Sequence, residues 1–586
     1  MSLTRQSSVA RTLLLAAAAG SALAAPAPDA LAQGVRYQSL SGNASVVDET
    51  FGIARDHADD AVLSVGFTAS FSDDLFAARR NDAGELLWAS TYNTVATNAF
   101  NRDRGSSVAF DAFDGAGYVL AGTTNAPTAN ADRLDNLLIG IQPNGDVRFA
   151  AQYIGTAFSD QAHLSLIRAA ITSAPAIIQS QADGHLFVVA HNANNLVDAR
   201  PMAFRTDPDG ALIAAADYRF PQALTDRVGF TDIVELPPGS AFPDRTFALV
   251  GSALDTTGER DVFLMVVSET LTPLLTRRFD ATTTKPGANA PASASGLAVT
   301  FDHASSQLAI VGVTDLGAAA ATSGFPAFAA PHVLRLDADD DFAVVDWSVY
   351  DPALGASFND QPPALLPSWE PSFTAATNLG AGAQRQLVIA GTALPPSSGP
   401  EAAAAFAVDA SGDLVWSQAY ANFSFGRALA PGADCGVALA GSYSGLPGLP
   451  PFSPFAPIAD YALQTDADGT TGCFERAVPF QRQTLQFQTQ TLNAFFNPLQ
   501  GQADVSVVRN TTDNAVLVCS SDACPDLPCP ADANGDGLVN ADDLLIVLGN
   551  FGQPASGPAE GDLNDDALVN ADDLLIVLAA FGDPCP

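Results

Sequence analysis

The chain has 586 residues, of which 47% are apolar, so it is long enough for several domains and a substantial core. It carries 64 acidic and 26 basic residues, with a formal net charge of −38, and Lys285 is its single lysine. A surface of this sign repels phosphate backbones, which argues against nucleic acid as a partner. It suits divalent cations or a saline medium.

Residues 1–32 have the features of a secretory signal peptide. Arg5 and Arg11 precede the apolar run 12–19, and two small-residue triplets offer cleavage sites, the later one just before Gln33. The run is shorter than the roughly 20 apolar residues that a membrane-spanning helix needs, and Gly, Asp or Pro interrupts every later apolar run. We therefore expect an exported protein, secreted or associated with the cell surface, without a transmembrane segment.

Residues 33–480 contain a sequence repeat with a period of roughly 57 to 72 residues. A short apolar strand ending in small residues recurs seven times, at 62–66, 118–122, 186–190, 248–251, 308–312, 387–391 and 437–441. A second strand, a turn rich in Asp, Asn and Gly, and a third strand follow each copy, and a fourth precedes the next copy, as at 107–110 and 297–300. Seven units of four strands predict a mainly β fold, a seven-bladed β-propeller, which leaves few exposed strand edges.

Aromatic residues follow the turn glycine at fixed distances. An aromatic residue often stands four residues on and a tyrosine eight residues on, as in Gly84, Trp88 and Tyr92. Even spacing keeps both rings on one face of a strand. The segment 50–54 has no first strand before it, so we expect it to be an outer strand that completes the last blade. The Val-x-Gly strands and Asp-x-x-Gly turns resemble the SBBP-type propeller repeats of exported bacterial proteins.

The acidic turns have two interpretations. Clusters such as Asp337, Asp339, Asp340 and Asp341 offer hard oxygen ligands for calcium. Tight hairpin turns also require Asp, Asn and Gly, because these residues tolerate positive φ. We favour the hairpin interpretation, since the turns lack a fixed ligand spacing. The six histidines share no register and form no catalytic or metal-binding motif, so we expect them to be structural.

Residues 481–528 depart from the repeat. Alternation of Gln and Thr with apolar residues at 484–489 predicts one or two strands packed against the propeller, or a short extra unit, and the Cys- and Pro-containing segment 519–525 predicts a stapled linker. In an exported chain we expect the six cysteines to pair. Proximity in sequence favours one of the fifteen connectivities that six cysteines allow. It pairs Cys435 with Cys473, Cys519 with Cys524, and Cys529 with Cys585.

Residues 529–586 carry the strongest signal, two twelve-residue loops thirty residues apart with the ligand spacing of an EF-hand. The first loop places oxygen donors at positions 1, 3, 5, 7, 9 and 12, which are Asp532, Asn534, Asp536, the Leu538 carbonyl, Asn540 and Asp543. The second loop places Asp562, Asn564, Asp566, the Leu568 carbonyl, Asn570 and Asp573 in the same roles. Such donors predict two Ca²⁺ ions rather than magnesium or zinc.

The two loops differ at position 6, where the chain turns sharply. That position is Gly537 in the first loop and Ala567 in the second. If it needs positive φ, alanine introduces strain of about 1 kcal/mol or more, so we expect the second site to be weaker.

Each loop runs into the same eight residues, at 541–548 and at 571–578, which predict one helix per repeat. Leu544, Leu548 and Phe551 are spaced to lie on one helical face, and a glycine after the phenylalanine provides a stop. Two loop-and-helix repeats at the end of an exported chain resemble a dockerin. The resemblance implies calcium-dependent docking to a cohesin-like receptor through the helix surfaces, in two orientations related by a pseudo-two-fold axis.

The flanking Cys529-Pro530 and Cys585-Pro586 resemble the ends of the GC-type dockerins of planctomycete-like bacteria. A disulfide bond between these cysteines would contribute about 4 kcal/mol by the loop-entropy relation. The family often carries Ser-Thr at its receptor contacts, whereas this chain has Ala-Asp at 541–542 and 571–572, which leaves the receptor type open.

Two functions from different classes follow. We favour a non-catalytic exported propeller, not an enzyme, which presents a surface to a glycan or protein ligand and is attached through its dockerin. The alternative is a dockerin-bearing enzyme of polysaccharide catabolism, a glycoside hydrolase or lyase with its active site in the propeller. Paired carboxylates about 5 to 9.5 Å apart in a central groove would favour the enzyme. Acidic residues confined to the turns would favour the binding protein.

Overall fold

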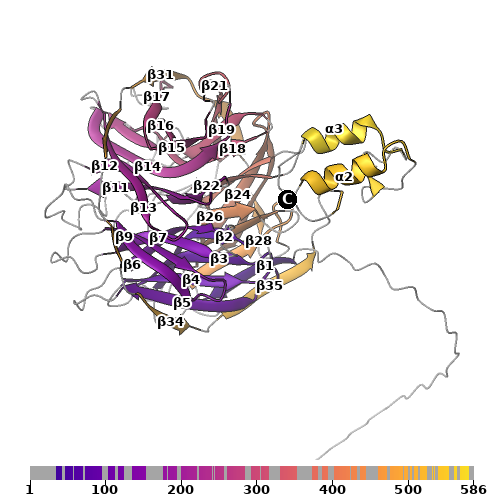
Figure 1. Cartoon of the computed structure of the whole chain (residues 1–586), viewed down its shortest axis with the longest axis horizontal. Coiled ribbons are helices and arrows are strands. Elements are labelled where there is room, and N and C mark those ends of the chain that lie inside the picture. The colour runs from indigo at the N-terminus through magenta and orange to yellow at the C-terminus, as the bar shows by residue number, and fades with distance from the viewer. Residues whose placement is uncertain are drawn as a thin grey trace, which may run out of the picture.

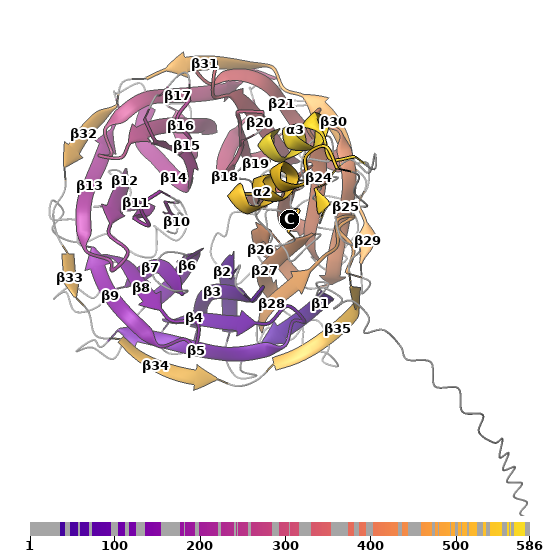
Figure 2. The same cartoon turned by 45° about the vertical axis from the view of Figure 1, so that its right-hand side comes forward.

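The seven-bladed β-propeller is confirmed. The computed structural model describes residues 35–41, 47–56, 59–69, 73–94, 103–111, 117–124, 135–153, 176–180, 182–193, 199–220, 224–239, 242, 244–255, 260–283, 292–303, 305–315, 330–352, 373–379, 386–393, 402–422, 424–431, 436–443, 459–471, 475–478, 480–492, 494–498, 502–504, 507–512, 515–523, 531, 533–534, 539–553, 560–561, 563 and 568–579. They form seven antiparallel five-stranded sheets, which stand around a central axis as blades (Figure 2). Two short helices, α2 (Ala541–Gly549) and α3 (Ala571–Ala579), lie to one side of the ring (Figure 1).

Four strands of each blade follow one another along the chain, and we number blades 1 to 7 from the N-terminus. Blade 1 contains β2 (Val47–Arg55), β3 (Val62–Ala69), β4 (Asp73–Arg80) and β5 (Leu86–Thr94). Blade 2 contains β6 (Asp103–Phe110), β7 (Tyr118–Thr124), β8 (Asp135–Ile141) and β9 (Val147–Tyr153). Blade 3 contains β10 (Ala176–Gln179), β11 (Leu186–Ala193), β12 (Ala199–Thr206) and β13 (Leu212–Arg219). Blade 4 contains β14 (Leu224–Leu236), β15 (Thr246–Asp255), β16 (Arg260–Ser268) and β17 (Pro273–Ala281).

The remaining blades repeat this order, except that the last one takes a strand from the other end of the chain. Blade 5 contains β18 (Ala294–Asp302), β19 (Gln307–Thr314), β20 (Ala330–Asp337) and β21 (Ala343–Pro352). Blade 6 contains β22 (Phe373–Leu379), β23 (Gln386–Ala393), β24 (Ala402–Asp409) and β25 (Leu414–Asn422). Blade 7 contains β26 (Ser424–Pro431), β27 (Val437–Tyr443), β28 (Ala459–Gln464) and β1 (Val35–Ser41). The pairing of β1 with β28 closes the ring.

The first strand of each blade lies innermost, because these strands contact one another in sequence around the axis. The recurring apolar strand of the sequence repeat is therefore the second strand, and the strand before each copy is the innermost strand of the same blade. The expectation that 50–54 is an outer strand of the last blade is wrong, since β2 is the innermost strand of blade 1 and pairs with β3. The strand that completes the last blade, β1, precedes the first recognisable repeat.

A long C-terminal segment, residues 476–523, runs around the outside of the ring and adds a fifth strand to every blade (Figure 2). We call this segment the belt. Its strands are β29 (Arg476–Ala477), β30 (Phe480–Thr484), β31 (Phe487–Thr491), β32 (Phe495–Pro498), β33 (Gln502–Asp504), β34 (Val507–Thr512) and β35 (Ala515–Ala523), on blades 6, 5, 4, 3, 2, 1 and 7 in that order. The sequence predicts one or two strands here, whereas the structure has seven, most of them too short to show a period.

The turns between third and fourth strands follow hairpin chemistry. Gly84, Gly145, Gly210, Gly412 and Gly469 adopt φ of 73 to 85°. The Oδ1 atom of Asp409 accepts the backbone N–H groups of Ser411 (2.8 Å) and Asp413 (2.9 Å), so it caps its own turn. Blade 4, whose turn lacks the Asp and Gly signal, places Leu271 at φ 63° instead. These contacts show that the acidic residues serve hairpin turns, and the alternative of calcium binding is not tested by them.

A tyrosine eight residues after a turn residue with positive φ fastens five of the blades to the next. Its hydroxyl donates to a turn carbonyl of the following blade at five junctions, Tyr92 to Gly145 (2.8 Å), Tyr153 to Gly210 (2.5 Å), Tyr218 to Leu271 (2.9 Å), Tyr350 to Gly412 (2.8 Å) and Tyr420 to Gly469 (2.9 Å). Trp88, four residues after its glycine, donates to the Pro143 carbonyl (2.7 Å) of the same next blade. The two rings therefore lie on one face of the strand, as their spacing predicts.

Candidate docking surface of the C-terminal repeats

The two helices of the C-terminal module, residues 529–586, begin within the last three positions of the predicted loops, at Ala541 and Ala571. Asn540 precedes α2, and its backbone N–H donates to the Oδ2 atom of Asp543 (2.8 Å), three residues on. The N–H of Asn570 donates in the same way to Asp573 (2.8 Å) before α3. A carboxylate that reaches back to the N-cap backbone is one half of a capping box, which explains why each helix begins there.

The two repeats bury a shared apolar core between their helices. Its fully or nearly fully buried members are Ala531, Ala533, Val539, Val547, Leu563, Val569 and Val577. Several of them are equivalent positions thirty residues apart, such as Val547 and Val577, which are 0% exposed. The α carbon of Val547 lies 3.0 Å from where a side chain on Gly561 (φ 88°) would begin, so the glycine permits this close packing. The module therefore has a complete core of its own.

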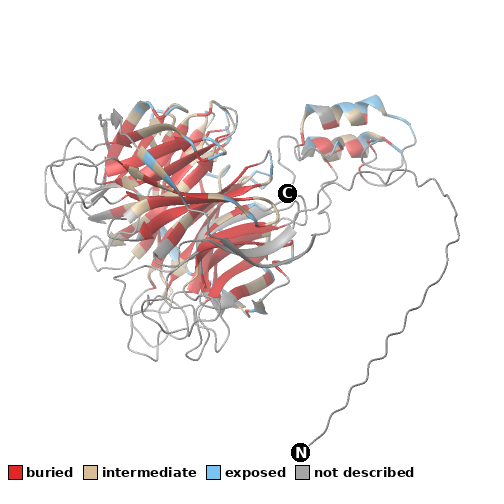
Figure 3. Cartoon of the chain, turned by 90° about the horizontal axis from the view of Figure 1, so that it is seen from below, coloured by how far each residue is buried: buried red, intermediate tan, exposed pale blue. Residues whose placement is uncertain are grey.

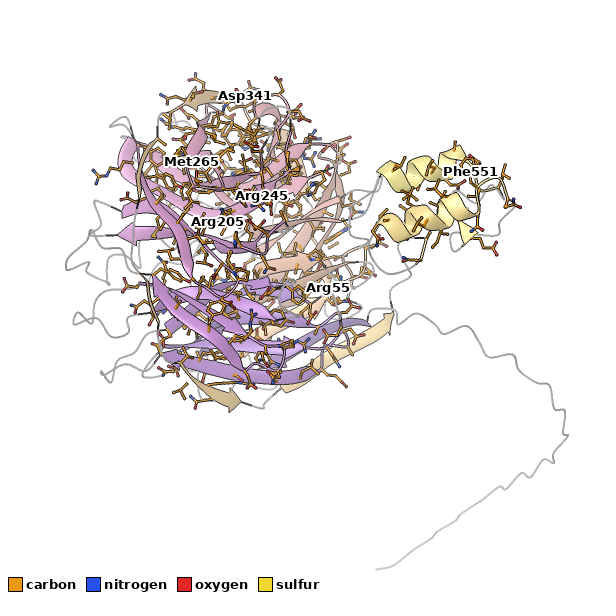
Figure 4. The ribbon with its side chains drawn as sticks, viewed as in Figure 1. Arg55, Arg205, Arg245, Met265, Asp341 and Phe551 are labelled. Atoms are coloured by element: carbon orange, nitrogen blue, oxygen red, sulfur yellow. The ribbon has the colours of Figure 1, made fainter. Side chains whose placement is uncertain are left out.

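Large apolar side chains remain exposed outside this core, on the helices and just beside their ends (Figure 3). The exposed members are Leu545 (63%), Leu548 (49%), Phe551 (48%), Leu568 (44%) and Leu578 (51%). Leu548 and Leu578 are equivalent in the two repeats, and Figure 4 labels Phe551 just after α2. The grouping of Leu544, Leu548 and Phe551 on one face does not hold, because Leu544 packs against the core while the other two face outward. The helix is almost wholly apolar, so its sequence has no alternation of apolar and polar residues that would distinguish the buried face from the exposed face.

The closing carboxylates of both predicted calcium loops are turned into the loops. The Oδ1 atom of Asp543 accepts the N–H of Asn534 (3.1 Å), and that of Asp573 accepts the N–H of Leu563 (2.7 Å). Both aspartates are 0% exposed, although they stand at the start of short helices. Each carboxylate thus joins its helix to the opposite arm of the preceding loop.

Six of the twelve predicted calcium donors lie within the described residues. Asn534, Asn540 and Asp543 of the first loop and Leu568, Asn570 and Asp573 of the second are described, and Asp532, Asp536, Leu538, Asp562, Asn564 and Asp566 lie outside the described residues. Among the residues that the structure does describe, no three His, Cys, Asp or Glu side chains are placed to hold a metal ion. The backbone of Cys519 lies in β35, whereas the other five cysteines fall outside the described ranges, so their pairing stays a prediction.

One charged cluster of the propeller ties blade 3 to blade 4. Arg205 and Arg245 both donate to Asp183, at 2.9 and 2.8 Å, and Arg245 also pairs with Glu269 (2.6 Å) across blades 3 and 4 (Figure 4). Burial would raise the pKa of Asp183, but the Arg245 guanidinium and the hydrogen bond from the backbone N–H of His185 hold that pKa well below its usual range. Sequence reasoning misses this cluster, because its members come from four separate turns and strands.

His332 is fully buried in blade 5, and both of its ring nitrogens have a partner. Its Nδ1 atom accepts the indole N–H of Trp347 (3.1 Å), and its Nε2 atom lies 3.0 Å from the carbonyl of Ser295. Burial lowers the pKa of His332 to about 4, so the ring is neutral at physiological pH.

Comparison with known proteins adds little to these observations. No family model matches the chain, and no curated protein matches it. Among solved structures, the tail fiber of Staphylococcus aureus phage P68 is similar at 7% sequence identity and a TM-score of 0.15, over 65% of this chain and 94% of that one. A TM-score this low carries no argument. No helix within the described residues is long and apolar enough to cross a bilayer.

Proposed function

We propose that this protein is an exported, non-catalytic β-propeller that is attached through a dockerin-like C-terminal module to a cohesin-like receptor on a cell-surface or multiprotein assembly. The observation that supports this most is the exposure of Leu545, Leu548 and Leu578 on the two helices, and of Phe551 just after α2, outside the core that the helices share. Exposed apolar side chains that recur at equivalent positions of a duplicated unit are typical of a surface that binds a partner.

The charge of the module defines the partner further. Residues 529–586 contain eleven acidic residues and no lysine, arginine or histidine. A receptor that buries these helices must therefore offer an apolar patch whose rim is basic, since like charges across the rim would oppose association. The same charge makes docking sensitive to salt, because rim charges act mainly on the rate of association.

Calcium is the metal that the donor set fits best. The ion would be held in the first loop by Asp532, Asn534, Asp536, the Leu538 carbonyl, Asn540 and Asp543, and by the equivalent six residues in the second. The inward carboxylates of Asp543 and Asp573 agree with this donor set. A bound cation would offset part of the module's charge and fix each loop against the start of its helix.

A calcium titration of the full-length mature chain tests the metal sites. Calorimetry should give two calcium ions per chain, and Asp532→Ala should remove one of them. Asp542→Ala, which changes a neighbouring carboxylate outside the donor set, is the matched control and should leave both ions bound. Ala567→Gly should tighten the weaker site, because glycine relieves the strain expected at position 6. A stoichiometry of zero in the unaltered chain would refute the metal sites.

Surface plasmon resonance against a panel of immobilised cohesin domains tests docking. We expect at least one to bind in calcium and to release the protein in EGTA, and Leu545→Asp with Leu548→Asp should abolish that binding. The doubly substituted chain should still bind two calcium ions, which would show that it is folded and that only the surface is lost. Absence of binding to every cohesin, or binding unaffected by the two substitutions, would contradict the proposed receptor or the proposed surface. Release of reducing sugars from polysaccharides would contradict the non-catalytic assignment.

A further inference from the structure

The belt is wound around the ring in the direction opposite to the blades. Its C-terminal strand β35 lies on blade 7, and the preceding strands lie on blades 1, 2, 3, 4, 5 and 6 in turn (Figures 1 and 2). The last residue of β35, Ala523, pairs with Val35 at the start of β1. The C-terminal module is therefore connected to the propeller only through the free end of the belt.

Each belt strand is the outermost strand of its sheet and contributes little to the core. Val478, Leu485 and Leu492 are the belt residues buried among the core clusters of the described chain. All five residues of β31 are exposed, and its sequence alternates Gln and Thr. Removal of the belt would thus leave four-stranded blades with nearly all of their buried apolar residues in place.

Closure of the ring does not depend on the belt. β1 pairs with β28 from Tyr37 to Ser41, and the first strands of blades 1 and 7 contact each other directly. Two arginines instead tie the belt to the rim at separate points. Arg509 of β34 donates to Ser90 (2.9 Å) and Asp146 (2.8 Å). Arg482 of β30 makes the equivalent contacts to Ser348 (2.8 Å) and Asp413 (2.8 Å).

We propose that the belt is a mechanical buffer between the propeller and its attachment point. Tension applied to the C-terminal module loads the hydrogen bonds of β35 one after another from its free end, so the strand peels from β1. The load then passes to β34, β33 and onward to β29, with the arginine ties as the strongest points. The ring stays closed while the belt extends, because strand-by-strand opening needs less force than disruption of a packed core. The inference rests on the proposed function in one respect, which is that docking of the C-terminal module to a receptor supplies the tension.

Optical tweezers test this on the full-length mature chain. One handle is attached at Thr270, an exposed residue of the turn between β16 and β17, and the other directly at the C-terminus. We expect a series of small extensions before any blade unfolds. The belt contains 48 residues, so these extensions should total about 170 Å at the extended length per residue. One further step from unfolding of the C-terminal module is separate and insensitive to changes in the belt.

Two substitutions assign the steps. Arg509→Met should lower the force of the step that frees β34 without changing the first step, and Arg509→Lys should restore part of that force by keeping the charge. Unfolding of the ring in the first event, or a belt released all at once with no effect of Arg509→Met, would overturn the proposal. Because the handle bypasses the receptor, this result is independent of whether a cohesin binds.

Discussion

The guanidinium group of Arg80 in blade 1 forms an ion pair with the carboxylate of Asp460 in blade 7, and both side chains are 0% exposed. The pair spans the seam at which the two ends of the propeller meet. Thr50 and Ser64 of blade 1 donate to the same carboxylate, at 2.6 and 3.3 Å. The apolar cluster at this seam consists mostly of alanines, which leave room for the arginine.

Arg80→Met should lower the free energy of unfolding by about 3–5 kcal/mol, because it leaves the charge of Asp460 buried without its partner. Arg80→Met combined with Asp460→Leu should recover most of this loss, since both charges are then removed. Arg509→Met at the exposed rim is the control and should cost about 1 kcal/mol or less. Guanidinium unfolding followed by tryptophan fluorescence measures all three, and a small effect of Arg80→Met alone would show that the seam is not closed by this pair.

The inter-blade tyrosines predict that two opposite substitutions have effects of different size on stability. Tyr350→Phe removes the donor to the Gly412 carbonyl and should cost about 1–3 kcal/mol, because that buried acceptor loses a partner. Blade 4 carries Phe279 at the equivalent position, and there Arg277 donates to the Phe342 carbonyl (3.1 Å) instead. Phe279→Tyr should therefore stabilise the protein little. Denaturant unfolding of the two variants provides the comparison, and equal effects of opposite sign would contradict it.

Much of the propeller could be predicted from its repeats, and the reason lies in the turns. The turn glycine and the tyrosine eight residues on recur because most junctions use the same hydrogen bond, as between Tyr92 and Gly145. Blade 4 lost the glycine signal, yet Leu271 adopts the required positive φ and its carbonyl accepts the hydrogen bond from Tyr218. The sequence could not show which of the four strands in a repeat is the innermost one. The strands are similar, so a repeat of four can be divided into blades at any of them.

The belt and the docking surface were accessible to sequence reasoning only in part. A belt strand as short as β29, with two residues, has no periodicity. Other belt strands have partners hundreds of residues away, as in Arg509 beside Ser90. The loop donors of the C-terminal module follow from fixed spacing. The buried face of α2 does not follow from the sequence, because the stretch 544–548 is apolar throughout. Packing against the other repeat decides that Val547 is buried and Leu548 is exposed.

A partly buried carboxyl in blade 4, that of Asp232, predicts how stability depends on pH. Burial raises the pKa of Asp232 to about 7 from 3.8, although backbone N–H groups of Val299 (2.8 Å) and Ile233 (2.9 Å) donate to it. Between those pH values the folded state holds a proton that the unfolded state releases, so stability falls as pH rises from about 4 to 7, by at most about 1.4 kcal/mol per pH unit. Asp232→Asn should remove this slope. Urea unfolding of both proteins across this range measures it, and parallel curves would contradict the prediction.

Val547 and Leu548 are adjacent in α2 but should respond to alanine in opposite ways. Val547 is 0% exposed in the shared core, so Val547→Ala should destabilise the C-terminal module by about 2 kcal/mol through lost burial and a cavity. Leu548 is 49% exposed, so Leu548→Ala should change stability by less than about 0.5 kcal/mol. Thermal unfolding of the module in calcium measures both stability changes. Cohesin binding, measured at a low temperature at which both variants are folded, tests the surface. Binding should weaken for Leu548→Ala and persist for Val547→Ala, and the reverse pattern would place the receptor on a different face.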